Sequence, residues 1–180
     1  MPNFTEVLKF WFEDHGPAAW FSKNDEFDAL IRENFMALYQ AAIAGEFWQW
    51  RHTPRGRLAE VLVLDQFSRN LFRDDARAFA QDALALILVQ EAIAGGFDRQ
   101  LTAQQRTVLY LPFMHSESLV IHQQALLIYE ELGQPDNLDY EKRHYEIIAK
   151  FGRYPHRNKV LGRVSTPEEI AFLATPGSSF

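Results

Sequence analysis

Apolar side chains recur every three or four residues through most of this 180-residue chain, a spacing that places them on one face of a helix. No segment shows the sustained two-residue alternation and β-branched enrichment that are typical of a strand. The first periodic stretch aligns Phe4, Val7 and Leu8, and Asn3 with Glu6 has the spacing of a capping box in front of it. The pattern predicts an all-α protein.

Capping residues, prolines and glycines divide the pattern into further helices. Pro112 lacks a backbone donor and clashes with the preceding turn, so a break is expected near Tyr110 to His115. Two further helices are predicted over about 24–44 and 54–70. The next begins near Ala80 and is closed by Gly95, another is capped by Thr102, and another is ended by Gly133. The last two cover about 139–151 and a stretch that begins at Thr166. Short connections favour one antiparallel helical bundle or stacked helical hairpins in a single domain, 1–180, without regular repeats.

Composition excludes several classes of function. Without cysteine the chain has no disulfide, thiolate nucleophile or thiolate metal site, and its composition fits a reducing compartment. The longest purely apolar run, Ala83 to Val89, is far shorter than the ~20 residues of a membrane span. We therefore expect a soluble cytoplasmic protein that does not enter the membrane.

A cationic island stands out in this acidic chain. Between Lys142 and Arg163 there are seven Lys or Arg residues and one acid, Glu146, so the island carries +6 and the remainder of the −6 chain carries −12. The run from Phe151 to Asn158 supplies its densest part: Arg153, His156, Arg157 and Asn158. Such a field attracts carboxylates and phosphates. The alternative is a solvated surface cluster, and the overall negative charge makes nucleic acid an unlikely partner.

Polar residues interrupt the apolar stripe of the predicted third helix. They are Asp65, Gln66, Arg69 and Asn70. Polar groups at interior positions need partners, and such positions concentrate at functional sites. Two structural explanations remain open: the end of the helix leaves the core, or Asp65 and Arg69 pair at i, i+4.

Three residues are candidates for acid–base chemistry. His115 and Glu117 follow the predicted break, where a histidine can move protons near neutral pH and the carboxylate can orient it or act as a base. His156, between two arginines, is the third candidate. The alternative for His115 and Glu117 is a structural role at a helix start.

Other chemistries find little support in the residues. The histidines and Glu117 lack the spacing of a metal site, His-Glu-x-x-His is absent, and we predict no metal and no cofactor. His122 and His144 belong to the same set of possible ligands, and His144 lies on an apolar helix face, as a core histidine does. There is no Gly-x-Ser-x-Gly elbow and no glycine-rich phosphate loop.

Four blocks of sequence together resemble one known family. The blocks are Trp11-Phe12 with Trp20-Phe21, Leu64 to Asn70, Leu111 to Glu117, and Phe151 to Asn158 continued by Leu161 to Thr166. They resemble the domain-of-unknown-function family numbered 924, which is found mainly in bacteria and is grouped with tetratricopeptide-like helical folds. The chain departs from the family at Ser68, where proline is usual, and at Tyr154, where phenylalanine is common. The resemblance implies the fold and no established activity.

The residues and the resemblance lead to one main hypothesis. The third, sixth and C-terminal helices would meet at a pocket that binds an anionic small molecule or an acidic peptide end, with Asp65 and Glu117 orienting the cationic groups. The expected ligand-binding residues are Asp65, Gln66, Arg69, Asn70, Arg153, Arg157, Asn158 and Arg163. One alternative is a hydrolase or lyase with His115 or His156 as general acid or base. Another is an adaptor that binds a protein partner through exposed aromatics such as Trp48 and Trp50.

Overall fold

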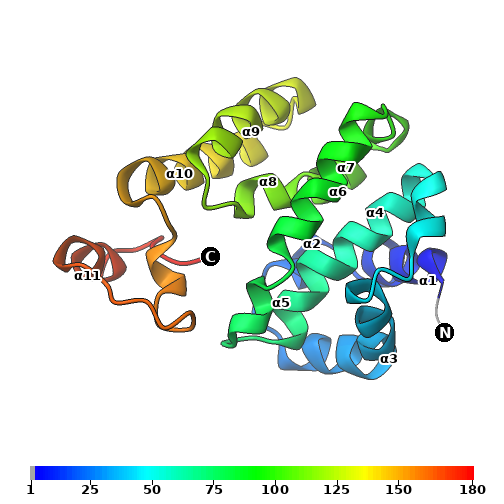
Figure 1. Ribbon diagram of the computed structural model, residues 1–180, viewed down its shortest axis with the longest axis horizontal. Helices are drawn as coiled ribbons and strands as arrows, with labels where there is room; N and C mark the ends of the chain where they lie inside the picture. The colour runs from blue at the N-terminus through cyan, green and yellow to red at the C-terminus, as the bar shows by residue number, and fades with distance from the viewer. Residues whose placement is uncertain (1–2) are drawn as a thin grey trace. The chain divides into compact units, whose positions relative to one another are not determined.

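The computed structural model describes residues 3–180, and over this range it contains helices and no strand (Figure 1). The all-α prediction is confirmed. The described chain separates into two compact units: one holds the residues up to Arg73 with Arg77–Pro112, and the other holds Asp74–Ala76 with Phe113–Phe180. The expectation of a single domain stays a prediction. Within residues 3–180 no helix has the length and apolar character needed to cross a membrane.

The first unit is built around one central helix. Its helices are α1 (Phe4–Lys9), α2 (Pro17–Trp20), α3 (Asp25–Ile43), α4 (Pro54–Leu62), α5 (Ser68–Leu71), α6 (Asp82–Ala94) and α7 (Ala103–Leu109). α4 contacts α1, α6 and α7, while α3 packs against α5. The predicted capping boxes at Asn3 and Thr102 are both present, and the side chain of Asn24 caps α3.

Aromatic rings fill the core of the first unit. Trp11 and Trp20 stack with ring centroids 5.3 Å apart, and the indole N–H of Trp20 donates to the backbone oxygen of Trp11 at 2.9 Å. Phe67 packs against Phe35 and against Trp11. Burying such large rings contributes strongly to stability, and the hydrogen bond satisfies a polar atom that would otherwise be costly there.

The predicted third helix is present, with one irregular turn in its middle. α4 continues into a π-helical turn, η3 (Val63–Phe67), and then into α5. Such single turns insert an extra residue into a helix and often mark functional sites. The turn contains Asp65 and Gln66.

The second unit contains a helical hairpin. Gly133, with φ of 71°, ends α9 (Leu119–Leu132), and Pro135 occupies the first position of α10 (Pro135–Phe151). The two helices pack against each other, and their short connection makes them antiparallel neighbours. α10 begins at Pro135 rather than near Asp139, because the proline starts the helix ahead of its apolar stripe.

Two further predicted boundaries are observed, whereas the helix expected from Ala80 begins at Asp82 as α6. The break at Pro112 separates α7 from α8 (Leu111–His115), with Tyr110 between them. α11 (Pro167–Leu173) begins with the expected capping box of Thr166 and Glu169. The long segment between α10 and α11 has only the short turn η6 (Pro155–Arg157), and it holds most of the predicted site residues of this unit.

Candidate functional site

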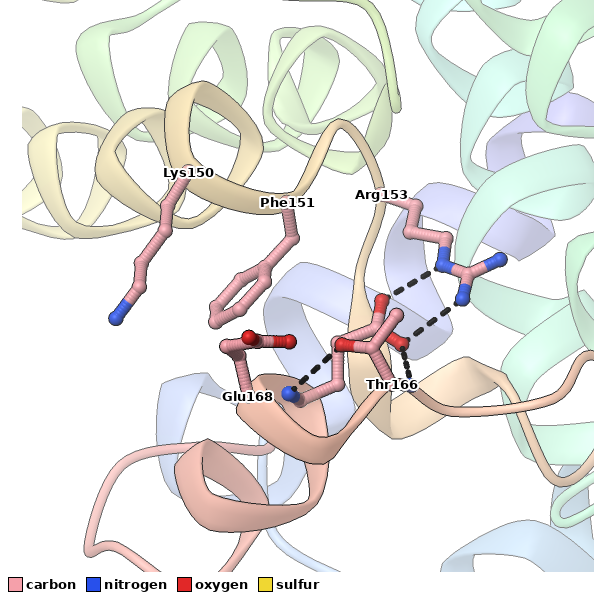
Figure 2. A pocket seen from close by; sticks show the side chains of 6 residues that line it. Lys150, Phe151, Arg153, Thr166 and Glu168 are labelled. Carbon is pink, nitrogen blue, oxygen red and sulfur yellow. Dashed lines mark hydrogen bonds and ion pairs between the residues drawn. The ribbon is translucent and has the colours of Figure 1, made fainter.

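Arg153 forms a two-point ion pair with a glutamate that sequence reasoning did not select. Nε of Arg153 donates to Oε1 of Glu169 at 2.7 Å, and Nη2 donates to Oε2 at 2.8 Å (Figure 2). The Glu169 side chain is only 2% exposed. The Arg153 hydrogen bond, helped by the backbone N–H of Thr166, lowers the pKa of Glu169 to about 2. Glu169 is therefore an anion near neutral pH and fixes the guanidinium of Arg153.

A second pair of the same type joins Arg163 to Glu117. Nη1 and Nη2 of Arg163 donate to the two oxygens of Glu117 at 2.7 and 2.9 Å. The backbone N–H of Tyr154 donates to Glu117 at 2.7 Å. Burial acts to raise the pKa of Glu117, but the hydrogen bonds from Arg163 and Tyr154 outweigh it and lower the pKa from its ordinary value. Glu117 is thus held as a carboxylate by the C-terminal segment.

Asn158 connects the two ion pairs. Its Oδ1 accepts from Nε of Arg163 at 2.9 Å, and its Nδ2 donates to Oε2 of Glu169 at 3.1 Å and to Oγ of Ser165 at 3.0 Å. Asn158 is buried. The predicted residues Glu117, Arg153, Asn158 and Arg163 therefore belong to one continuous polar network, which orders the segment between α10 and α11.

Arg157 belongs to this segment and is 5% exposed. Its Nη2 donates to the backbone oxygen of His115 at 3.0 Å, and its guanidinium lies 4.7 Å from the ring centroid of Tyr154. The hydroxyl of Tyr154 donates to the backbone oxygen of Met114 at 2.5 Å. Arg157 and Tyr154 thus tie the C-terminal segment to α8.

The histidines of the second unit occupy different surroundings. His115 and His156 are partly buried, whereas His122 and His144 are buried. Nδ1 of His144 donates to the backbone oxygen of Tyr140 at 2.7 Å, and burial lowers the pKa of His144 to about 3. The interpretation of His144 as a satisfied core histidine is confirmed. Across residues 3–180 no three metal-binding side chains are grouped to hold an ion.

His122 makes a buried pair with Glu141 that the sequence did not reveal. Nδ1 of His122 lies 2.6 Å from Oε1 of Glu141, and Nε2 lies 2.7 Å from the backbone oxygen of Ser116. The carbonyl can only accept, so Nε2 carries a proton and a second proton lies on Nδ1 or Oε1. Burial raises the pKa of Glu141 despite this hydrogen bond. The two residues are far apart in the sequence, and only the hairpin brings them together.

A hollow of about 420 Å³ lies beside the first ion pair, between the end of α10 and the start of α11 (Figure 2). Its walls are Lys150, Phe151, Arg153, Thr166, Glu168 and Glu169. The ammonium of Lys150 lies 5.0 Å from the centroid of the Phe151 ring. Within the described chain Nη1 of Arg153 donates no hydrogen bond, whereas Nε and Nη2 both donate. Lys150 and Phe151 were not predicted as site residues, although Lys150 belongs to the cationic island.

The predicted polar residues of the first unit are buried or partly buried around the π-helical turn. Arg69 pairs with Asp82 through contacts of 2.8 and 3.0 Å, and its distance to the Asp65 carboxylate is 3.4 Å. The amide of Gln66 donates to Asp65 at 2.6 Å. The expected i, i+4 contact of Asp65 and Arg69 is therefore present, but the closer carboxylate is Asp82.

Asn70 takes part in a separate buried contact of the first unit. Its Nδ2 donates to Oδ1 of Asp28 at 2.8 Å, and Arg73 binds the same carboxylate at 2.6 and 2.7 Å. Neither Asp28 nor Arg73 was selected from the sequence, because their partners lie on a different helix. All of these residues belong to the first unit, and a pocket that they share with the C-terminal arginines stays a prediction.

Of the two tryptophans proposed for an adaptor surface, Trp48 is 58% exposed. Trp50 is partly buried and stacks on Phe47, with ring centroids 3.9 Å apart. A protein-binding face built on both rings would therefore offer mainly Trp48.

The whole chain has relatives that share its fold. It is similar to a solved structure of a protein of unknown function from Agrobacterium tumefaciens, with 36% sequence identity, a TM-score of 0.90, and coverage of 95% of this chain and 96% of that chain. No curated protein matches the chain. The model of the bacterial proteins of unknown function called DUF924 matches residues 7–177. This match covers nearly the full length of the chain and includes all four sequence blocks that resemble the family. The chain belongs to the DUF924 family.

Proposed function

We propose that this protein binds a small anionic molecule, or the acidic end of a peptide, in the hollow beside Arg153. The observation that carries the proposal is the fixed guanidinium of Arg153, a residue that lines a hollow of about 420 Å³ and whose Nη1 donates no hydrogen bond within residues 3–180. Ligand pockets usually measure about 300–1,000 Å³, so this volume suits a small ligand or a few peptide atoms.

Glu169 prepares Arg153 for this role and also limits it. The two-point pair holds the guanidinium plane, so little side-chain entropy is lost when an anion binds to Nη1. The same carboxylate offsets the charge of Arg153, so a ligand anion needs a second cation. Lys150, on the wall of the hollow, supplies it.

The other predicted arginines of this unit support the site without lining it. Arg157 is buried against Tyr154, and Arg163 is paired with Glu117. We assign them to the positioning of the segment that carries Arg153. Removing either would lower affinity indirectly, through a loosened segment.

The test compares two lysines of the same helix. Lys150→Ala removes a cation from the hollow, whereas the control Lys142→Ala removes an exposed cation that does not line it. Melting temperatures are measured with inorganic phosphate, succinate and a short peptide ending in two aspartates. A ligand at 100 times its dissociation constant adds about 2.7 kcal/mol to stability. We expect at least one anion to stabilise the natural protein and the control, and to stabilise Lys150→Ala less.

Arg153→Lys is the companion variant, because Arg153→Ala would leave Glu169 buried without its partner. Lysine keeps the charge and loses the fork of donors, so affinity should fall while the fold is kept. Equal stabilisation of all four proteins by an anion would place that anion elsewhere. No response to any probe would also overturn the proposal and favour the adaptor.

The enzyme alternative, with His115 or His156 as general acid or base, stays a prediction, as do the cytoplasmic location and the absence of a nucleic-acid partner. No contact in the described chain favours a hydrolase or lyase over a binding protein.

A further inference from the structure

The ring of Phe180 sits among three aromatic side chains of the second unit. Its centroid lies 3.9 Å from that of His144, 4.7 Å from that of His156 and 5.3 Å from that of Tyr154. Tyr154 in turn contacts both histidine rings edge-on or tilted, at 5.7 Å. The spacings of Phe180 from His156 and Tyr154 are those of favourable aromatic pairs, and the His144 ring lies closer still.

Two of the three side chains that surround Phe180 are held by the rest of the unit. Tyr154 is buried, and its hydroxyl donates to Met114. His144 is buried, and its Nδ1 donates to Tyr140. Two walls of this aromatic cradle of His144, Tyr154 and His156, namely His144 and Tyr154, are therefore fixed by contacts that do not involve Phe180.

Phe180 is attached far more loosely than its surroundings. Its side chain is 55% exposed, and the residues from Ala174 to Gly177 are exposed as well. Ser178 is buried and donates to the backbone oxygen of Leu173 at 3.1 Å. Segments with few buried contacts open at little free-energy cost, so the ring can leave while the unit stays folded.

We propose that the aromatic cradle is a binding site for one flat, uncharged aromatic ring, that Phe180 occupies it in the free protein, and that a free aromatic ring displaces Phe180 from it. The cradle suits such a ring because all three of its walls are aromatic. Displacement would uncover His156, one of the predicted acid–base residues. The inference does not depend on the anion site at Arg153.

The experiment follows His144 by nuclear magnetic resonance in the natural protein, in Phe180→Trp and in Phe180→Leu. His144 reports on the cover because its pKa is low chiefly from burial, with smaller contributions from His115, His122 and His156. We expect Phe180→Trp to keep the low pKa and Phe180→Leu to raise it toward the ordinary value of 6.5. A pKa of His144 that is equal in all three proteins would show that Phe180 does not cover the cradle.

Phenol is then added as the probe. It should shift the His144 and His156 signals of Phe180→Leu at lower concentration than those of the natural protein, where Phe180 competes, and Phe180→Trp should behave like the natural protein. If phenol shifts neither histidine signal of Phe180→Leu although this variant has a native circular dichroism spectrum, the proposal is overturned. Phenol that shifts them equally in all three proteins would contradict the competition with Phe180.

Discussion

Arg153 and Glu169 form a two-point ion pair in which the carboxylate is buried and, within residues 3–180, Nη1 of the guanidinium donates no hydrogen bond. The pair links the end of α10 to the start of α11, and Asn158 extends it to the pair of Arg163 and Glu117. A guanidinium held in this way is a prepared donor for an anion.

Glu169→Gln should change how stability depends on acid pH. The pKa of Glu169 is lowered to about 2, below its ordinary value of 4.5, so its ion pair stabilises the folded state above pH 4.5 and this contribution is lost as pH falls toward 2. The variant should be less stable at pH 7 and should lose less stability than the natural protein between pH 4.5 and 2. Urea unfolding at several pH values measures both; parallel curves for the two proteins would refute the role of the pair.

His144 should make the folded state sensitive to pH over a different range. Its pKa is about 3 in the folded state and ordinarily 6.5, so the unfolded chain binds more protons between these values. Stability should therefore rise with pH in this interval, by up to about 1.4 kcal/mol per pH unit from this one group.

His144→Asn removes that titration while Asn can still donate to Tyr140. Its free energy of unfolding should depend less on pH between 4.5 and 6.5, an interval in which Glu169 of the folded protein stays ionised. An undiminished slope in this variant would assign the effect to other groups.

The pair of His122 and Glu141 should be costly to break from one side. Glu141→Ala leaves Nδ1 of a fully buried histidine without its partner, and a buried unsatisfied polar atom costs about 1–3 kcal/mol. Glu141→Gln keeps an oxygen that can accept and should cost less. Chemical denaturation ranks the three proteins; equal losses for both variants would show that side-chain packing, not the hydrogen bond, is what matters.

Trp11 should be among the most sensitive positions of the first unit. It is fully buried and stacks on Trp20, and a buried tryptophan replaced by alanine costs about 3–5 kcal/mol. Trp48→Ala is the control, because Trp48 is largely exposed and surface substitutions usually stay within about 0.5 kcal/mol. Comparable losses for the two variants, measured by urea unfolding, would contradict this description of the core.

The fold could be predicted from the sequence wherever its signals are local. Asn3, Thr102 and Thr166 with the acids or amides three residues later cap helices, and Pro112 breaks one, because these effects act within a single turn. The π-helical turn at Val63–Phe67 has no comparable local signal, so the sequence predicted an unbroken helix there.

The candidate site was predictable only in part, because its partners are distant in the sequence. Arg153, Asn158 and Arg163 were recognised from their charge and from the family's motifs. Glu169 looked like an ordinary capping-box acid, and Asp82 and Asp28 like ordinary helix-start acids, because nothing local shows which arginine will reach a given carboxylate. The likeness to tetratricopeptide folds stays a prediction.

Isothermal titration of the natural protein, Lys150→Ala and Lys142→Ala with the anion that gives the largest thermal shift tests the central claim most directly. Binding of one anion with near-equal affinity to the natural protein and Lys142→Ala, and at least tenfold weaker binding to Lys150→Ala, is the result we expect. Equal affinity for all three proteins, or no heat of binding with any of them, would contradict an anion site beside Arg153.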